Sequence, residues 1–175
     1  MTSSSKRELI PVNIAVLTAS DTRSESEDKS GHALVERITE AGHQLADKRM
    51  TRDDVYQIRA VVSAWIADPG VQVIITTGGT GVSGRDGSPE AIMPLLDKKL
   101  DGFGEMFRVL SYDDIGTSTL QSRTLAGVAN GTYVFVLPGS TGACKLAWEK
   151  LICHQLDYRT RPCNLVEMMP RLLEK

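Results

Sequence analysis

The chain has 175 residues, of which 41% are hydrophobic and 24% charged, and its formal net charge is −2. This composition is that of an ordinary globular protein with one hydrophobic core, and the lack of a basic excess argues against nucleic acid as a partner. No apolar run reaches the ~20 residues of a membrane-spanning helix, and residues 1–8 lack the apolar stretch of a secretory signal. We therefore expect a cytoplasmic protein without a membrane partner, with a flexible extension over residues 1–9 and one domain over residues 10–175.

Short runs of β-branched residues alternate with amphipathic helical patterns along the chain. The runs predict buried parallel strands at 13–20, 71–77 and 132–137. A more polar run at 43–50 predicts a strand nearer a sheet edge. Apolar residues at helical spacing predict helices at 30–41, 54–67, 88–96, 103–111 and 143–154. This order predicts an α/β fold, a three-layer α/β/α sandwich around a mostly parallel sheet.

Three loops that follow predicted strands are rich in glycine and in small or hydroxylated residues. They contain Ser20 and Asp21 in the first loop, Thr77, Gly78, Gly79, Thr80 and Gly81 in the second, and Pro138, Gly139 and Ser140 in the third. Because the carboxyl ends of parallel strands lie at one edge of a sheet, we expect these loops to frame one cleft. Backbone N–H groups there suit the phosphate groups of a ligand. The glycine spacing is neither that of a P-loop nor that of a dinucleotide fingerprint.

Three aspartates in or beside these loops are candidates for chemistry, and each has a structural alternative. Asp21 could make hydrogen bonds within its loop, and Asp86 could be a turn residue before Gly87. Asp53 is one of four residues, 51–54, that could cap the following helix. The residues alone leave these alternatives open.

Other reactive side chains point less clearly to a function. The three cysteines, 144, 153 and 163, fit no zinc motif and are expected to be reduced thiols. Cys144 stands near a predicted helix start, where the helix dipole could lower its pKa, but a small buried residue is the favoured interpretation. Arg123 could bind phosphate or form a structural ion pair, and Arg159 and Arg161 are expected at a surface or an interface.

Several segments spread along nearly the full length match one known family. They are Leu17–Asp21, Asp28–Gly31, Thr76–Gly81, Asp86–Ala91, Gly102–Glu105, Gly116–Arg123 and Leu137–Ser140. On these segments the chain resembles the MoaB/MogA family of molybdopterin-binding proteins, which act in molybdenum cofactor biosynthesis. Gly116–Arg123 and the tail Arg159–Asn164 resemble the MoaB branch.

The resemblance implies a MogA-like, molybdopterin-binding fold that binds molybdopterin and ATP. Adenylylating family members join a molybdopterin phosphate oxygen to the α-phosphorus of ATP and release pyrophosphate. Their two catalytic acids fall on Asp53 and Asp86, which would also hold Mg²⁺. The alternative is a non-catalytic protein that binds molybdopterin or a nucleotide while a MogA paralogue carries out the reaction; a weaker one is a nucleotide-hydrolysing protein.

Two motifs are expected to border the substrate. Ser30 and Gly31 begin a predicted helix, with Asp28 or Ser30 as its cap, and would close over the ligand. The motif Ser88–Pro89–Glu90, in which Ser88 caps a helix and Pro89 takes its first position, would direct a helix dipole at the ligand.

The resemblance also implies partners beyond molybdopterin and ATP, namely further copies of the chain and other molybdenum cofactor biosynthesis proteins. We expect a homo-oligomer, a trimer or a hexamer. The residues add only that Leu120, Leu125 and Val128 are apolar side chains that a small monomer need not expose.

Overall fold

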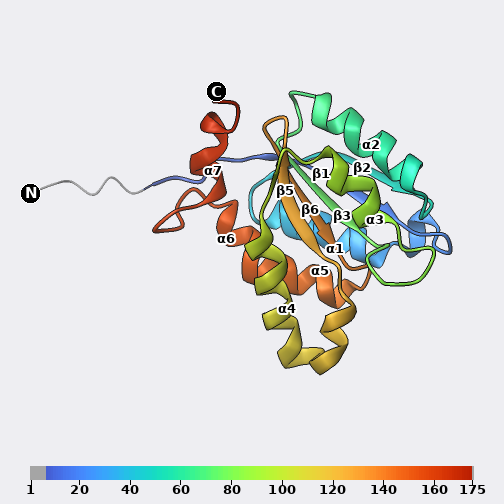
Figure 1. Ribbon diagram of the computed structural model, residues 1–175. Helices are drawn as coiled ribbons and strands as arrows, with labels where there is room; N and C mark the ends of the chain where they lie inside the picture. Colours follow the sequence, from blue (N-terminus) through green and yellow to red (C-terminus); the bar gives the residue numbers. More distant parts are fainter. Residues whose placement is uncertain (1–6, 175) are drawn as a thin grey trace, which may run out of the picture.

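The computed structural model describes residues 7–174 and contains one six-stranded sheet with helices on both faces (Figure 1). The strand order is β2-β1-β3-β6-β5-β4, in which the first four strands are parallel and the last two pair antiparallel. The strands are β1 (Asn13–Ala19), β2 (Gln44–Thr51), β3 (Val73–Thr77), β4 (Lys98–Lys99), β5 (Leu125–Ala129) and β6 (Thr132–Leu137). The predicted α/β architecture and mostly parallel sheet are thus confirmed, and the polar strand β2 lies at a sheet edge as predicted.

Seven α-helices connect or follow these strands in the described part of the chain. They are α1 (Lys29–Glu40), α2 (Val55–Ala67), α3 (Ser88–Ile92), α4 (Asp101–Ile115), α5 (Thr141–Ala147), α6 (Cys153–Gln155) and α7 (Leu165–Met168). A π-helical segment, η4 (Trp148–Ile152), joins α5 to α6, so the predicted helix over 143–154 is one continuous helical stretch. Three-residue 3₁₀ segments, η1 (Glu25–Glu27), η2 (Met93–Leu95) and η5 (Met169–Arg171), and the longer η3 (Gly116–Gln121) complete the elements.

The antiparallel strands β4 and β5 were absent from the sequence prediction. Strand β5 reads Leu-Ala-Gly-Val-Ala, which lacks the β-branched density of the other strands. The turn between β5 and β6 is Asn130–Gly131, and both residues have positive φ, 48° and 79°. A two-residue Asn-Gly connection with positive φ at both positions is typical of a tight hairpin, so this dipeptide was the signal for the pair.

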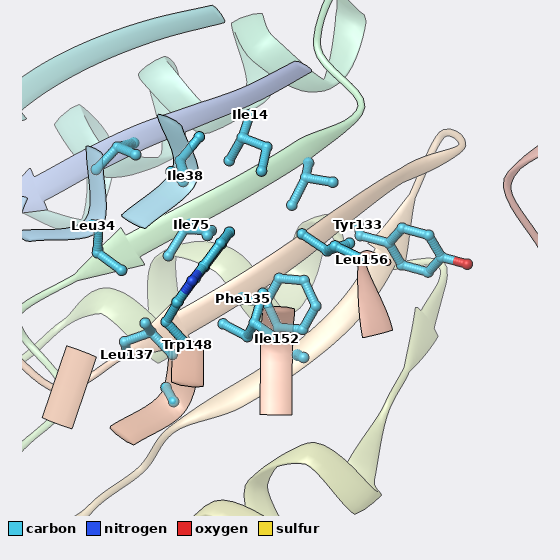
Figure 2. Packing of buried hydrophobic residues seen from close by; sticks show 14 of the residues in the cluster. Ile14, Leu34, Ile38, Ile75, Tyr133, Phe135, Leu137, Trp148, Ile152 and Leu156 are labelled. Carbon is cyan, nitrogen blue, oxygen red and sulfur yellow. The ribbon is translucent and has the colours of Figure 1, made fainter. Parts of the chain in front are cut away.

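Alternating strand residues supply two cores, one on each face of the sheet. Ile14 and Ile75 face α1 and the α5–α6 stretch, where Leu34, Ile38 and Trp148 are also buried (Figure 2). On the other face, a second buried cluster joins Ala15, Leu17, Ile74 and Val136 to Ile58, Val62 and Trp65 of α2. Helix α1 therefore covers one face and α2 the other, as a period-two strand pattern requires.

The first described residues contact the C-terminal segment. The Arg7 guanidinium lies 2.9 Å from a Glu167 carboxylate oxygen and 4.6 Å from the centre of the Tyr158 ring. Residues 1–6 of the predicted extension lie outside the described residues, so its boundary at residue 9 stays a prediction. Within residues 7–174, no helix combines the length and the apolar character needed to cross a membrane.

Candidate functional site

The connections diverge to opposite faces of the sheet between β1 and β3. After β1 the chain passes into α1 on one face, whereas α2 leads into β3 from the other face and α3 follows it there. Such a switch point opens a crevice at the carboxyl ends of the strands, where ligands bind in open α/β sheets. The predicted loops after β1, β3 and β6 meet here, joined by a fourth loop after β2.

An open cleft of about 290 Å³ occupies this crevice. It is lined by Ala19, Ser20, Asp21, Thr22, Arg23, Asp53, Gly78, Gly79, Ser83, Arg85, Asp86 and Gly139. The lining includes predicted residues from all four loops. It also includes Thr22, Arg23, Ser83 and Arg85, none of which was among the site residues predicted from the sequence.

Two glycines form the centre of the cleft because no side chain fits there. Gly78 has φ +101°, and a Cβ on it would lie 2.1 Å from the carbonyl oxygen of Ala19. Gly79 has φ +63°, and a Cβ on it would lie 2.4 Å from Asp53 Oδ1. The N–H of Gly78 donates to Leu137 O at 3.1 Å, so it holds the loop to β6 and is not a donor for a ligand. This corrects the expectation that the whole glycine run offers free N–H groups.

Asp53 is not the helix cap, because the adjacent Asp54 caps α2. The Asp54 side chain accepts hydrogen bonds from the N–H groups of Tyr56 and Gln57. Asp53 Oδ1 is instead buried and has no hydrogen-bond partner among the described residues. A buried carboxylate oxygen without a partner is costly, which makes it a candidate for a ligand or a cation.

The three cleft aspartates differ in their electrostatics. Burial, followed by repulsion from Asp86 and then Asp21, raises the pKa of Asp53, against an opposing hydrogen bond from the Gly87 N–H. A hydrogen bond from the Ser83 hydroxyl, which lies 2.6 Å from Asp86 Oδ2, is the main cause that lowers the pKa of Asp86. Asp21 Oδ1 accepts the Asp53 N–H at 3.0 Å, so Asp21 ties the β1 and β2 loops together.

Arg123 acts as a structural brace behind the cleft. Its guanidinium donates to Gly81 O at 2.8 Å and to Asp86 O at 2.9 Å, and it forms an ion pair with Glu90. Of the two alternatives for Arg123, a phosphate ligand or a structural ion pair, the contacts fit the ion pair, and Glu90 is its partner. Arg159 pairs with the partly exposed Asp157 at the surface.

Several predicted ligand-binding residues do not line the cleft. They are Thr77, Thr80, Gly81, Pro138, Ser140, Ser30, Gly31, Ser88, Pro89 and Glu90. Their contacts are internal: the Thr77 hydroxyl donates to Pro138 O, and the Ser140 hydroxyl accepts the Ala143 N–H as the cap of α5. The hydroxyl groups of Thr77 and Ser140 therefore stabilise the loops through backbone partners.

The Ser88 motif supports the glycine loop instead of capping α3. Gly87 is the N-cap, and Ser88 is the first helical residue. The Ser88 hydroxyl donates to Gly78 O at 2.8 Å, and its N–H donates to Gly79 O at 3.0 Å. The predicted Ser88 cap is therefore wrong, and Pro89, which was predicted at the first helical position, is the second residue of α3.

Cys144 is a buried residue, as favoured. Burial raises the pKa of its thiol to about 11, although a hydrogen bond with Thr77 acts in the opposite direction. A thiol with a raised pKa is protonated at neutral pH and is a poor nucleophile.

The start of α1 is held by a buried ion pair that spans three elements. Asp28, which is fully buried, caps α1 by accepting the Gly31 N–H at 2.9 Å, so Asp28 and not Ser30 is the cap. Its Oδ2 also lies 2.9 Å from Lys48 Nζ on β2. Lys48 forms a second ion pair with Glu25 of η1, at the far end of the loop that lines the cleft. The pair therefore fixes this loop to the sheet.

We expect Lys48→Met to lower the free energy of unfolding by about 3 kcal/mol at pH 7, because it leaves a buried carboxylate without its cation. Burial alone would raise the pKa of Asp28, but hydrogen bonds from Lys48, Gly31 and Thr18 outweigh it and lower the pKa. A lowered folded-state pKa means that the stabilisation is present above the unfolded value, ~3.9, and is lost as pH falls through the folded value. Without Lys48 the pKa of Asp28 rises, so the deficit of the variant should shrink as pH falls from 7 to 4.5.

Urea unfolding at the two pH values measures this deficit. Lys29→Met is the matched control, because Lys29 is exposed and forms no ion pair with the described residues. The control should stay within ~0.5 kcal/mol of the parent protein. A Lys48 variant as stable as the control would show that the buried pair contributes nothing.

A larger hollow of about 440 Å³ lies along the edge strand β2 beside α2. Its main polar groups are already paired: Trp65 Nε1 and Arg49 Nε both donate to Asp47 Oδ2, at 3.0 and 2.8 Å. Size alone therefore does not identify the site. The cleft at the switch point has the unpartnered carboxylate and the converging loops.

Comparison with known proteins identifies a family for most of the chain. The family model described as a probable molybdopterin binding domain matches residues 15–158. Molybdenum cofactor biosynthesis protein B of Escherichia coli strain K12 is 57% identical over 157 residues, which are 90% of this chain and 92% of that protein.

Solved structures show the same similarity. A crystal structure of molybdenum cofactor biosynthesis protein B superposes with a TM-score of 0.83 at 43% identity, over 86% of this chain and 94% of that chain. The structure described as the molybdopterin biosynthesis enzyme MoaB from Thermus thermophilus gives 0.73 at 30% identity, over 81% and 89%. The chain therefore belongs to the molybdopterin-binding domain family of molybdenum cofactor biosynthesis, as a homologue of the MoaB proteins.

Proposed function

We propose that this protein binds molybdopterin and, with ATP and Mg²⁺, adenylylates it as a step of molybdenum cofactor biosynthesis. The observation that carries the proposal is the buried, unpartnered Oδ1 of Asp53, placed against Gly79 and close enough to Asp86 and Asp21 for the three charges to interact. A charged oxygen is costlier to leave buried without a partner than a hydroxyl, so a ligand or cation at Asp53 would offset that cost.

The donor set of the cleft fits Mg²⁺. Within residues 7–174, no group of three or more His, Cys, Asp or Glu side chains is arranged as a complete metal site. Mg²⁺ is usually held by one or two carboxylates together with substrate phosphates, and Asp53 and Asp86 would fill that role. When bound, the ion would neutralise part of the charge on the triphosphate.

The reaction needs positioning more than a protein nucleophile. A molybdopterin phosphate oxygen forms a bond to the α-phosphorus of ATP, and the bond from that phosphorus to the bridging oxygen of the β-phosphate breaks and releases pyrophosphate. The side chains of the cleft would hold the molybdopterin phosphate beside the α-phosphate of ATP and reduce the repulsion between them. Positioning and charge neutralisation are the main protein contributions to such transfers.

The direct test incubates the purified protein with molybdopterin, ATP and Mg²⁺. Adenylylated molybdopterin and pyrophosphate should form in equal amounts. Tight molybdopterin binding without product would instead favour the alternative, a non-catalytic binding protein working beside a MogA paralogue.

We predict that Asp86→Asn lowers this turnover by at least ~100-fold while the fold is retained. Asp86 Oδ2 accepts hydrogen bonds from the N–H and the hydroxyl of Ser83, and an asparagine oxygen can still accept both. The variant therefore loses the charge but keeps the turn. Full product formation would remove Asp86 from the catalytic set, and a melting temperature many degrees lower would restore the turn interpretation.

We also propose that the protein is a homo-oligomer, a trimer or a hexamer. The residues that supported this from the sequence need correction: Val128 is buried on β5 and Leu125 packs partly buried in the core, whereas Leu120 is 78% exposed. The better support is α4, which extends beyond the sheet in Figure 1. Its exposed apolar side chains Met106, Val109, Tyr112 and Ile115 recur at every third position, so they follow a stripe that winds around the helix. Contiguous exposed apolar side chains of this kind are typical of a surface that another protein covers.

Light scattering should give three or six times the 19.1 kDa chain mass. We expect Val109→Asp to reduce that mass, because a charge on an apolar contact is costly to bury. A control on the same helix, Asp113→Asn, keeps the apolar face intact and should not change the mass. A parent protein that is monomeric at micromolar concentration would refute the proposal.

A further inference from the structure

Two arginines line the cleft, and they differ in whether a carboxylate lies near the guanidinium. Arg85 is 78% exposed and lies 3.8 Å from Asp21 Oδ2. Arg23 has no carboxylate within 4 Å in the part of the chain that the structure describes. The positive charge of Arg23 is therefore available to an anion.

Both the backbone and the guanidinium of Arg23 are held by hydrogen bonds. The backbone N–H donates to the Ser20 hydroxyl at 3.3 Å. The guanidinium Nη1 donates to Gly139 O at 3.2 Å and to the Ser30 hydroxyl at 3.1 Å. Ser30 is fully buried and itself donates to Gly139 O at 3.2 Å. The side chain thus bridges the β1 and β6 loops in one defined orientation.

These contacts leave one edge of the guanidinium free. Both hydrogens of Nη1 are used by Gly139 and Ser30, whereas Nε and Nη2 of Arg23 donate to none of the residues between 7 and 174. The Nε and Nη2 edge is a planar fork that matches two oxygens of a phosphate or a carboxylate. An arginine whose rotamer is set by neutral partners also loses little conformational entropy when it binds.

The carboxylates of the cleft differ in whether they lie near an arginine. Asp21 shares the β1 loop with Arg23 and lies 3.8 Å from Arg85, whereas Asp53 and Asp86 follow β2 and β3, and Arg23 contacts the β6 loop at Gly139. A nucleotide that carries its own Mg²⁺ suits the carboxylates, but a phosphate monoester without a metal ion would be repelled by them. The monoester is better placed on the Arg23 side.

We propose that Arg23 is the anion anchor of the cleft and that the fork formed by its Nε and Nη2 receives the phosphate monoester of molybdopterin. The identity of this ligand rests on the proposed function; the presence of an anion anchor does not. Arg23 would hold two non-reacting oxygens of the monoester and leave the third to attack the α-phosphorus of ATP. It would also lower the repulsion between the two polyanions.

The test measures binding at equilibrium and does not depend on turnover. Calorimetry would give the dissociation constants of molybdopterin and of a Mg²⁺-bound non-hydrolysable ATP analogue for the parent protein and Arg23→Gln. Glutamine removes the charge and the fork, and its amide nitrogen does not reach as far as Nη1, so urea unfolding of the variant checks that the loop survives the loss of the contact to Gly139 O. Arg52→Gln is the matched control: it removes the same charge beside Asp53 from an exposed side chain that does not line the cleft.

We expect Arg23→Gln to weaken molybdopterin binding about 10- to 100-fold, which is the range for a lost charge-assisted hydrogen-bonded pair, and to change analogue binding less than threefold. Arg23→Lys should recover only part of the loss, because an ammonium lacks the fork. Equal losses in Arg52→Gln, or a loss confined to the ATP analogue, would overturn the assignment.

Failure of the proposed function gives a different result. If the parent protein forms no product but Arg23→Gln still loses molybdopterin affinity, the anchor stands and the transferase proposal falls. If the parent protein does not bind molybdopterin, titration with inorganic phosphate tests the anchor directly. Phosphate affinity that is the same in the parent protein and Arg23→Gln would then overturn it.

Discussion

Replacing Asp53 by asparagine is expected to raise the free energy of unfolding at pH 7 by roughly 1 kcal/mol and to reduce adenylyl transfer by ~100-fold or more. The buried Oδ1 of Asp53 has no partner, and the Asp86 and Asp21 charges repel it. A neutral amide removes this repulsion and can donate to a neighbouring carboxylate. The same change removes the oxygen that we assign to Mg²⁺, so stability and activity should move in opposite directions.

The stability gain should depend on pH in a defined way. Because burial and then the neighbouring charges raise the pKa of Asp53, the folded state binds a proton more readily than the unfolded state. The destabilisation is therefore fully present above the folded-state pKa and disappears as pH falls below the unfolded value, ~3.9. Chemical unfolding of the parent protein and Asp53→Asn at pH 7 and pH 4 should show the gap between them closing in acid.

The adjacent residue provides the matched control. Asp54 caps α2, and asparagine caps a helix about as well as aspartate does, so Asp54→Asn should change neither stability nor turnover appreciably. A loss of ~1 kcal/mol in Asp53→Asn with full activity would mean that Asp53 has a capping role after all. A gain in stability with full activity would remove Asp53 from the reaction.

A second large effect is expected at Gly78, where alanine should lower the free energy of unfolding by about 3 kcal/mol or more. The substitution adds two costs: positive φ at a residue with a side chain, and a Cβ placed 2.1 Å from the Ala19 carbonyl oxygen. Ala19 ends β1 and cannot move without disturbing the strand. The glycine loop and the β1 loop should therefore separate, and molybdopterin binding should weaken together with stability.

Gly84, in the following loop, separates this effect from the general effect of replacing glycine. A Cβ on Gly84 meets no atom within 4 Å, and its φ is not in the left-handed region. Gly84→Ala should therefore stay within ~0.5 kcal/mol of the parent protein in urea unfolding. Similar behaviour of the two variants would show that the close approach of Gly78 to β1 is not required.

Much of the architecture followed from short-range patterns in the sequence. β-branched runs such as 71–77 and helical spacing such as 54–67 depend on neighbouring residues, so they identified four strands and the main helices, and the polar run 43–50 indicated a strand near a sheet edge. The loops after β1, β3 and β6 followed from the rule that parallel strands end at one sheet edge. Strand β5 was missed because its residues are weak strand formers, although Asn130–Gly131 marked the hairpin.

Only the tertiary structure decided what each polar side chain in these loops does. Asp53 and Asp54 look equivalent in the sequence, and the start of α2 makes one the cap and leaves the other facing Gly79. Arg23 was not selected, because its orientation depends on Gly139, 116 residues away. Local periodicity sets which segments form strands and helices, since it acts through adjacent residues. The hydrogen-bond partners of the cleft side chains, and the free edge of the Arg23 guanidinium, depend on contacts between loops that are distant in the sequence. These contacts arise only when the sheet has assembled.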